Sequence, residues 1–351
     1  MTAITVPSTD LYARVRASIP RVEWDAAFAD DAEAIIRLKR ERNAVVLAHN
    51  YQTPEIFHGV ADIVGDSLAL AREAQNAEAD VIVLAGVHFM AETAKLLNPG
   101  STVLVPDLEA GCSLAESITA DDVLGLRAAH PGIPVVTYVN TSAAVKAVSD
   151  VCCTSGNAVK VIEHVVREWN VDKVIMIPDE YLAKNIGART GVEMITWPGR
   201  CEVHERFTPA DIAQIRESHP GVVVLAHPEC PPEVVRAADM AGSTADMAAY
   251  VAREKPASLA LITECSMSDN LAALHPEVDM VRPCNMCPHM KRSTLAKIRH
   301  SLETMTAEVT IDPAEWPVGS EFTGTAEVVA SDVPRDVPDV DADGLFTGGD
   351  A

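Results

Sequence analysis

The sequence predicts an α/β protein with three homologous three-layer α/β/α domains, whose parallel sheets are arranged around a pseudo-threefold axis. The first observation is an internal repeat: the pattern Asp-x-x-[Gly/Cys]-x-[Ser/Thr] begins at Asp62, Asp150 and Asp239, at spacings of 88 and 89 residues. A period of that length indicates duplicated folding units. The second observation is that short apolar runs alternate with helical patterns within each period, which is typical of parallel βαβ units.

The repeat divides the chain of 351 residues into three small domains, which agrees with the usual size of domains. Around them we expect an N-terminal arm and an acidic, disordered tail, since residues 312–351 hold ten acidic side chains against the single Arg335. The expected boundaries are 1–31 for the arm, 32–120, 121–208 and 209–291 for the repeats, 292–311 for a segment packing on the first repeat, and 312–351 for the tail.

Each domain is expected to follow one order of elements. After a helix at 32–42, the first domain begins with an apolar strand of the kind found in buried parallel sheets. A short helix, the recurring motif, a longer helix, a second strand, a further helix and a third strand follow. The expected strands are 44–48, 81–85 and 102–106 in the first domain, 133–137, 173–177 and 194–198 in the second, and 222–226, 259–263 and 279–283 in the third.

Two polar side chains follow the first strand of every domain in an i, i+2 relation, which points them the same way. The pairs are His49 with Tyr51, Tyr138 with Asn140, and His227 with Glu229. Ligands of open α/β sheets bind at the carboxyl ends of strands, and such side chains hold substrates or move protons. One pair alone would indicate local hydrogen bonding, but three equivalent pairs predict a shared binding site.

The recurring motif ends in a hydroxyl residue that precedes a helical run, at Ser67, Ser155 and Thr244. One interpretation is an N-cap, the commoner role for a hydroxyl in that place. The other is an anion site made of the hydroxyl and the free N–H groups of the helix start. Three copies around one axis favour the anion site.

Each domain closes on a cysteine, and these are Cys112, Cys201 and Cys287, at spacings of 89 and 86 residues. Equivalent thiolates on a pseudo-threefold axis would converge and could hold three corners of a [4Fe-4S] cluster. The fourth iron would then lack a protein ligand and act as a Lewis acid toward substrate oxygen.

A zinc site is the main alternative for the cysteines. Cys284-x-x-Cys287 could be half of such a site, completed by His204 or His289. Cys284 has no counterpart in the other repeats, so we leave it out of the ligand set and note that it could form a redox pair with Cys287. We expect the remaining cysteines to be packing residues, and they are Cys152, Cys153, Cys230 and Cys265.

The composition argues against several classes of protein. A formal net charge of −23 argues against a nucleic-acid-binding protein, which would carry a basic patch. No run of 18 apolar residues is present and residues 1–7 lack the features of a signal peptide, so we expect a cytoplasmic protein without a membrane partner. Eight cysteines in such a chain favour metal or redox chemistry over a disulfide framework.

Nine short motifs between Ala32 and Ile311 together resemble the quinolinate synthase family. They are His49-Asn-Tyr-Gln, Gly65-Asp-Ser, Gly111-Cys, Tyr138-Val-Asn-Thr, Cys153-Thr-Ser, Pro198-Gly-Arg-Cys, His227-Pro-Glu-Cys, Gly242-Ser-Thr and Cys287-Pro-His-Met-Lys. The resemblance implies three α/β domains around a [4Fe-4S] cluster held by three cysteines. It also implies a transferase of NAD biosynthesis that condenses iminosuccinate (iminoaspartate) with dihydroxyacetone phosphate to quinolinate, losing phosphate and two waters. Because iminosuccinate is unstable in water, transient contact with the enzyme that supplies it is expected.

Taken position by position, the resemblance makes Cys112, Cys201 and Cys287 the cluster ligands and Tyr51 a catalytic group. It assigns substrate binding to His49, Ser67, Tyr138, Val139, Asn140, Ser155, His227, Pro228, Glu229 and Thr244. Our hypothesis for the proton transfers makes Glu229 an acceptor and Tyr51 a donor, with His227 as the third catalytic group. No role is assigned to Glu264.

Two other functions remain as alternatives. A hydroxymethylbutenyl diphosphate reductase also uses three cysteines and an open iron, but the stretches that begin at His49 and His227 argue against it. The other alternative is a zinc-stabilised binding scaffold without catalysis.

Overall fold

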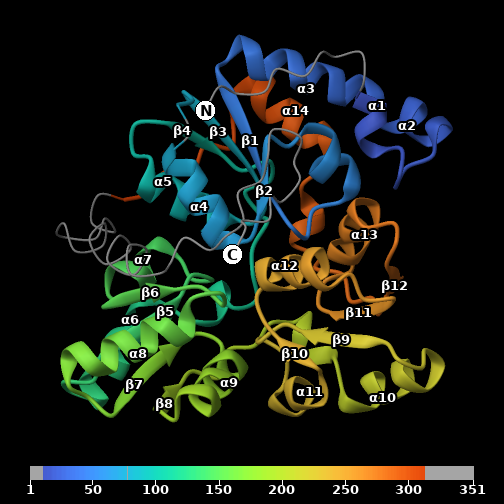
Figure 1. Ribbon diagram of the computed structural model, residues 1–351. Helices are drawn as coiled ribbons and strands as arrows, with labels where there is room; N and C mark the ends of the chain where they lie inside the picture. The colour runs from blue at the N-terminus through green and yellow to red at the C-terminus, as the bar shows by residue number, and fades with distance from the viewer. Residues whose placement is uncertain (1–10, 77, 313–351) are drawn as a thin grey trace.

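The computed structural model describes residues 11–76 and 78–312, which contain three four-stranded parallel sheets, one in each repeat. The strand orders are β2-β1-β3-β4, β6-β5-β7-β8 and β10-β9-β11-β12, so the same arrangement occurs three times. Figure 1 shows the first domain in blue, the second in green and the third in yellow and orange, around a common centre. The predicted fold class is confirmed.

The strands are short and their central members are almost wholly buried. The first sheet has β1 (Ala44–His49), β2 (Ile63–Gly65), β3 (Val81–Ala85) and β4 (Thr102–Leu104). The second has β5 (Val135–Tyr138), β6 (Val151–Cys153), β7 (Lys173–Ile177) and β8 (Glu193–Thr196). The third has β9 (Val223–Ala226), β10 (Met240–Ala241), β11 (Ser258–Ile262) and β12 (Asp279–Val281).

The recurring motif forms an edge strand in each sheet, in addition to the three strands per domain expected from the sequence. Its aspartate explains the repeat, because the carboxylate accepts a hydrogen bond from the backbone N–H of the central strand in each domain. Asp62 accepts from Val46, Asp150 from Val135 and Asp239 from Val224, each at 2.8 Å. A strand of two or three residues is too short for its alternation to be recognised in the sequence.

Helices cover both faces of each sheet. Those after the edge strands are α4 (Ser67–Asn76), α8 (Ala158–Trp169) and α12 (Thr244–Glu254). Those after the next strand are α5 (His88–Leu97), α9 (Glu180–Thr190) and α13 (Cys265–Leu274). The short helices after the central strands are η2 (Glu55–Val60), α7 (Ala143–Ala147) and α11 (Pro232–Ala237).

Each cysteine is followed by a single 3₁₀ turn and then by a helix. The turns are η3 (Ala115–Ser117), η4 (His204–Arg206) and η5 (Met290–Arg292), and the helices are α6 (Ala120–Ala129), α10 (Pro209–Ser218) and α14 (Leu295–Thr304). The helices α6 and α10 open the second and third domains. The third helix, α14, returns to the first domain and lies beside α3 (Ala29–Glu41), as Figure 1 shows, so it closes the ring of domains.

The first residues described are ordered helix rather than the loose arm predicted for them. They form α1 (Leu11–Val15) and α2 (Arg21–Ala27), which lead into α3. Leu11 and Val15 lie four residues apart on one face of α1, and together with Trp24 of α2 they are buried in the core of the first domain. Of the predicted acidic tail, all but Asp312 lies outside the described residues.

The largest hydrophobic core is shared by all three domains. It contains side chains from the central strand of every sheet, such as Leu47, Val136 and Leu225. The site described below lies directly against this core. None of the helices described is both long enough and apolar enough to cross a lipid bilayer.

Candidate active site

A cavity of about 720 Å³, measured to its open mouth, lies where the carboxyl ends of the three central strands meet. All three domains contribute to its wall. Twelve of the residues predicted from the sequence line it: His49, Tyr51, Ser67, Cys112, Tyr138, Asn140, Ser155, Cys201, His227, Glu229, Thr244 and Cys287. Val139 and Pro228 do not line it, since side chains alternate in direction along an extended backbone. Val139 is buried in the shared core instead.

The three repeat-equivalent cysteines are free thiols in this cavity. The 3₁₀ turn after each one directs two backbone N–H groups at the sulfur. The donors are Leu114 and Ala115 for Cys112, Val203 and His204 for Cys201, and His289 and Met290 for Cys287. Such donors stabilise a thiolate, the form that binds metals.

Burial has the opposite effect to these N–H groups on the pKa of the thiols. It raises the pKa of Cys112 to about 12 and that of Cys287 to about 11, and it raises the pKa of Cys201 as well. The metal-free site therefore holds thiols, and a metal would have to displace their protons. Three buried sulfurs with matching N–H donors are a donor set that suits an iron–sulfur cluster, since hydrogen bonds to sulfur are part of how proteins hold such clusters.

Five polar side chains from all three domains form one buried hydrogen-bond chain beside the sulfurs. The Tyr51 hydroxyl lies 2.6 Å from Thr263 Oγ1, which lies 2.9 Å from His204 Nε2. His204 Nδ1 lies 2.7 Å from Glu229 Oε2, and the Tyr138 hydroxyl donates to Glu229 Oε1 at 2.6 Å. The chain links a phenol to a carboxylate through groups that both donate and accept protons.

The protonation states of this chain follow from its burial and its internal contacts. Burial and the Glu229 charge raise the pKa of Tyr51 well above its usual value, so it is a phenol. Burial also acts against the ionised form of Glu229, but His227, His204 and Tyr138 outweigh it and hold that pKa well below its usual range. Burial lowers the pKa of His49 and of His227 to about 3, so both imidazoles are neutral at pH 7.

The hydroxyls at the helix starts face the cavity, and other residues cap α4 and α12. Ser243 is the N-cap of α12, so the N-cap alternative for Thr244 is wrong. Near the start of α4, Asp66 Oδ1 accepts from the Ala69 N–H at 2.9 Å. Because Asp66 and Ser243 make the capping contacts, the hydroxyls of Ser67 and Thr244 at the cavity wall can form hydrogen bonds with a ligand.

The structure adds two residues that the sequence analysis missed as site residues, His204 and Thr263. His204 had been considered only as a zinc ligand. It is the third residue after Cys201, a position that Ala115 and Met290 occupy in the other repeats, so the repeat gave no reason to select it. Thr263 directly follows β11 and is wholly buried.

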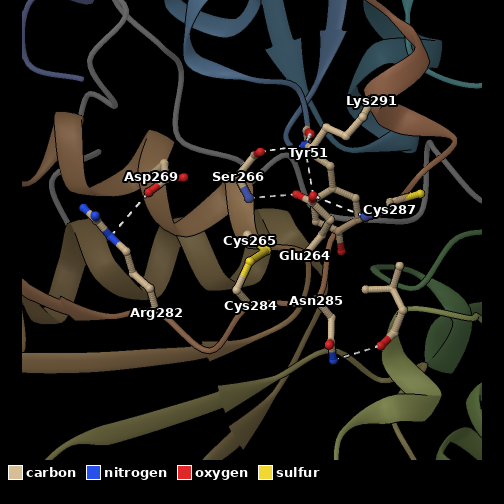
Figure 2. Close-up of a disulfide and its surroundings, with 11 residues drawn as sticks. Tyr51, Glu264, Cys265, Ser266, Asp269, Arg282, Cys284, Asn285, Cys287 and Lys291 are labelled. Atoms are coloured by element: carbon tan, nitrogen blue, oxygen red, sulfur yellow. Dashed lines mark hydrogen bonds and ion pairs between the residues drawn. A yellow bond between two sulfur atoms is a disulfide. The ribbon is translucent and has the colours of Figure 1, made fainter. Parts of the chain in front are cut away.

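The prediction that Cys265 is a packing residue is wrong, and the possible redox pair of Cys284 with Cys287 is not present. Cys265 and Cys284 form a disulfide, with Cα atoms 4.8 Å apart (Figure 2). Cys284 therefore has a partner other than Cys287, and Cys265 is not a packing residue. The start of α13 lies beside the chain that leaves β12, because β11 and β12 pair in parallel and Glu264 forms a bridge with Asn285. The disulfide also removes Cys284 from the alternative zinc site. Cys153 and Cys230 are buried, as expected for packing residues.

Comparisons with known proteins agree on one family. A family model described as "Quinolinate synthetase A protein" matches residues 33–317. "Quinolinate synthase 1" of Mesorhizobium japonicum is 67% identical over 323 residues, which are 91% of this chain and 98% of that protein. "Quinolinate synthase" of Agrobacterium fabrum is 68% identical over 309 residues, 88% of each chain. "Quinolinate synthase" of Xylella fastidiosa is 69% identical over 285 residues, 81% of this chain and 83% of that protein.

Proposed function

The chain belongs to the quinolinate synthase family and is an enzyme, and from this premise we propose that it condenses iminosuccinate with dihydroxyacetone phosphate. The product is quinolinate, formed with loss of phosphate and two waters, which makes the enzyme a transferase. Both substrates are small anions. A cavity lined by hydroxyl, amide and imidazole groups from three domains suits ligands of this kind.

Cys112, Cys201 and Cys287 are the proposed ligands of a [4Fe-4S] cluster. The observation that carries this proposal is their equivalence, since each is a free thiol that opens a 3₁₀ turn and accepts two backbone N–H groups in the same cavity. When bound, such a cluster supplies an iron with an open coordination position, a Lewis acid for substrate oxygen.

Local donors hold the substrates against an overall charge of −23. The hydroxyls of Ser67, Ser155 and Thr244 are proposed to bind carboxylate or phosphate oxygens. Asn140 and the neutral His49 add an amide and an imidazole to the same wall. Because neutral groups do these tasks, the anions are bound without any cationic side chain among those that line the cavity.

Glu229 and Tyr51 are the proposed acceptor and donor of protons. Glu229 is ionised and takes a proton from substrate carbon or nitrogen, while the phenol of Tyr51 gives one to the oxygen that leaves as water. The hydrogen bonds through His204 and Thr263 let the proton taken by Glu229 return to Tyr51. His227 stacks on His204, with ring centroids 4.6 Å apart, and holds it in place for this transfer.

The cluster assignment is tested by anaerobic purification and reconstitution. We expect a brown protein with four iron and four sulfide per chain that forms quinolinate from the two substrates. Cys112→Ser should lose most of the iron and all turnover, whereas the matched variant Cys152→Ser should retain both, because Cys152 does not line the cavity. A colourless protein that binds zinc and lacks turnover would instead support the scaffold without catalysis.

The supplier of iminosuccinate and the compartment follow from the same proposal. Because iminosuccinate is unstable in water, transient contact with the enzyme that produces it shortens its exposure to solvent. A location in the cytoplasm is part of the same proposal, because the three thiols of the site must stay reduced to bind metal.

A further inference from the structure

Glu264 is a buried carboxylate that the proposed mechanism does not use. Its side chain is 0% exposed. At the start of α13, Oε2 accepts from the Ser266 N–H at 2.8 Å. The other oxygen, Oε1, lies 2.9 Å from Lys291 Nζ and 3.4 Å from the backbone nitrogen of Cys287, which donates to it (Figure 2).

Lys291 connects this carboxylate to the loop that carries Tyr51. Besides its ion pair with Glu264, Nζ donates to the backbone oxygen of Tyr51 at 2.7 Å and to Ser266 Oγ at 2.6 Å. These three acceptors match the three N–H donors of an ammonium group. A single ion pair therefore contacts the backbone of the proposed proton donor and, through Glu264, the backbone of a proposed cluster ligand.

The first domain makes the same contact with its cysteine by a different route. Glu116, four residues after Cys112, accepts from the Cys112 N–H through Oε1 at 3.3 Å. In the third domain the residue four positions after Cys287 is Lys291, so the carboxylate comes from the end of a neighbouring strand instead. In two domains, therefore, a carboxylate accepts from the cysteine N–H, although the two glutamates occupy different positions in the repeat. This indicates that the contact is important for the cysteine and is not a by-product of the duplication.

We propose that Glu264 and Lys291 are positioning residues that fix the backbone of Tyr51 relative to that of Cys287. This inference rests on the proposed roles of Tyr51 and Cys287. This ion pair resists displacement, because its carboxylate is fully buried and breaking the pair would leave that charge uncompensated. A displacement of about 1 Å between reacting groups can cost about 100-fold in rate, so the pair would act on turnover without touching substrate.

Three variants and one control test this proposal. Lys291→Met removes the ammonium but keeps the aliphatic stem, Glu264→Gln removes the charge at nearly constant shape, and the double variant removes both charges. Asp269→Asn is the matched control. Asp269 forms an ion pair with Arg282 at 3.4 Å (Figure 2). Like Glu264, this ion pair joins α13 to the chain after β12, but it is exposed.

The first measurement is made on cluster-free protein with the disulfide intact, so it does not depend on turnover. We expect iodoacetamide to alkylate Cys287 on the order of tenfold faster in the single variants, because the loop opens more often. Cys112 in the same protein is the internal reference, and peptide mass spectrometry reports both. Asp269→Asn should alkylate at the wild-type rate.

The second measurement is made on reconstituted enzyme. We expect kcat to fall roughly 10- to 100-fold in both single variants while KM stays within about threefold, since neither residue lines the cavity. The double variant should recover thermal stability, because no charge is left unpaired, but not kcat.

Unchanged alkylation of Cys287 in all three variants, or a kcat that recovers together with stability in the double variant, would overturn the proposal. An equal loss in Asp269→Asn would do the same, since any link between α13 and the loop would then suffice. Full turnover by Tyr51→Phe would count against the proposed function instead, and the alkylation comparison would still decide the positioning of Cys287.

Discussion

Removing one hydroxyl from the buried chain tests the proton path most directly. Thr263 Oγ1 lies between the Tyr51 hydroxyl, at 2.6 Å, and His204 Nε2, at 2.9 Å. Thr263→Val keeps the branched shape of the side chain but removes the hydroxyl that Tyr51 and His204 contact. Thr263 is 0% exposed, so both neighbours lose this partner in a buried site. A matched variant, Thr263→Ser, keeps the hydroxyl and loses only a methyl group.

The expected magnitudes follow from these contacts. An unsatisfied buried polar group costs about 1–3 kcal/mol, so Thr263→Val should lower the free energy of unfolding by roughly 2–6 kcal/mol for its two neighbours. General acid–base catalysis contributes about 10²- to 10⁴-fold, so we expect kcat to fall at least about 100-fold. Thr263→Ser should keep kcat within about tenfold, because the proton path stays continuous.

The assay is quinolinate formation by reconstituted enzyme at matched iron content, with a thermal midpoint recorded for each variant. Matching the iron separates a broken proton path from a lost cluster. If Thr263→Val turns over within about threefold of the wild-type rate at equal iron content, the path through Thr263 and His204 is not used. A loss of the same size in Thr263→Ser would point to packing rather than to the hydroxyl.

Two further predictions concern stability. The folded protein keeps His49 neutral down to about pH 3, whereas the unfolded chain takes up a proton near pH 6.5. Its contribution to stability is therefore complete above about pH 6.5 and is lost as the pH falls, by about 1.4 kcal/mol per pH unit. His49→Asn should flatten the pH dependence of the urea midpoint between pH 6 and 4 by about that slope, and an unchanged slope would contradict a buried neutral imidazole. The disulfide between Cys265 and Cys284 closes a segment with a sequence separation of 19, and a loop of that size contributes about 3 kcal/mol. Dithiothreitol should lower the melting temperature of the wild type but not that of Cys265→Ser, and equal responses would show that the disulfide does not form in solution.

The fold and half of the residues that line the cavity could be predicted, because equivalent positions of the three repeats carry residues of similar kinds. A histidine and a tyrosine after one strand predict little by themselves. His49 and Tyr51 become candidate site residues because His227 and Glu229 occupy the same place two repeats later. The cysteines gain weight in the same way. Each prediction depended on a position rather than on a residue type, and all three cysteines line the cavity.

Residues that break the repeat could not be predicted this way. His204 is close to Thr263 only because the second and third domains pack together, and nothing in either segment indicates that contact. The disulfide depends on a contact within the third domain, since Cys265 and Cys284 are adjacent only through the pairing of β11 with β12. The edge strand β10 has two residues and is held by the Asp239 carboxylate near its start, so its sequence has no strand pattern to recognise.

The proton path proposed here joins repeated and unrepeated positions: Tyr51 and Glu229 belong to the repeated pairs that follow the first strands, whereas Thr263 and His204 do not. Repeated positions supply the sulfurs and the hydroxyls, which need only converge on the axis. A proton path needs direction, with a donor at one end and an acceptor at the other, and a threefold-symmetric set of side chains cannot provide it. The proposed path starts at Tyr51 in the first domain, crosses Thr263 in the third and His204 in the second, and ends at Glu229 in the third. It therefore exists only when all three domains are assembled, which ties proton transfer to the same packing that brings the three sulfurs together.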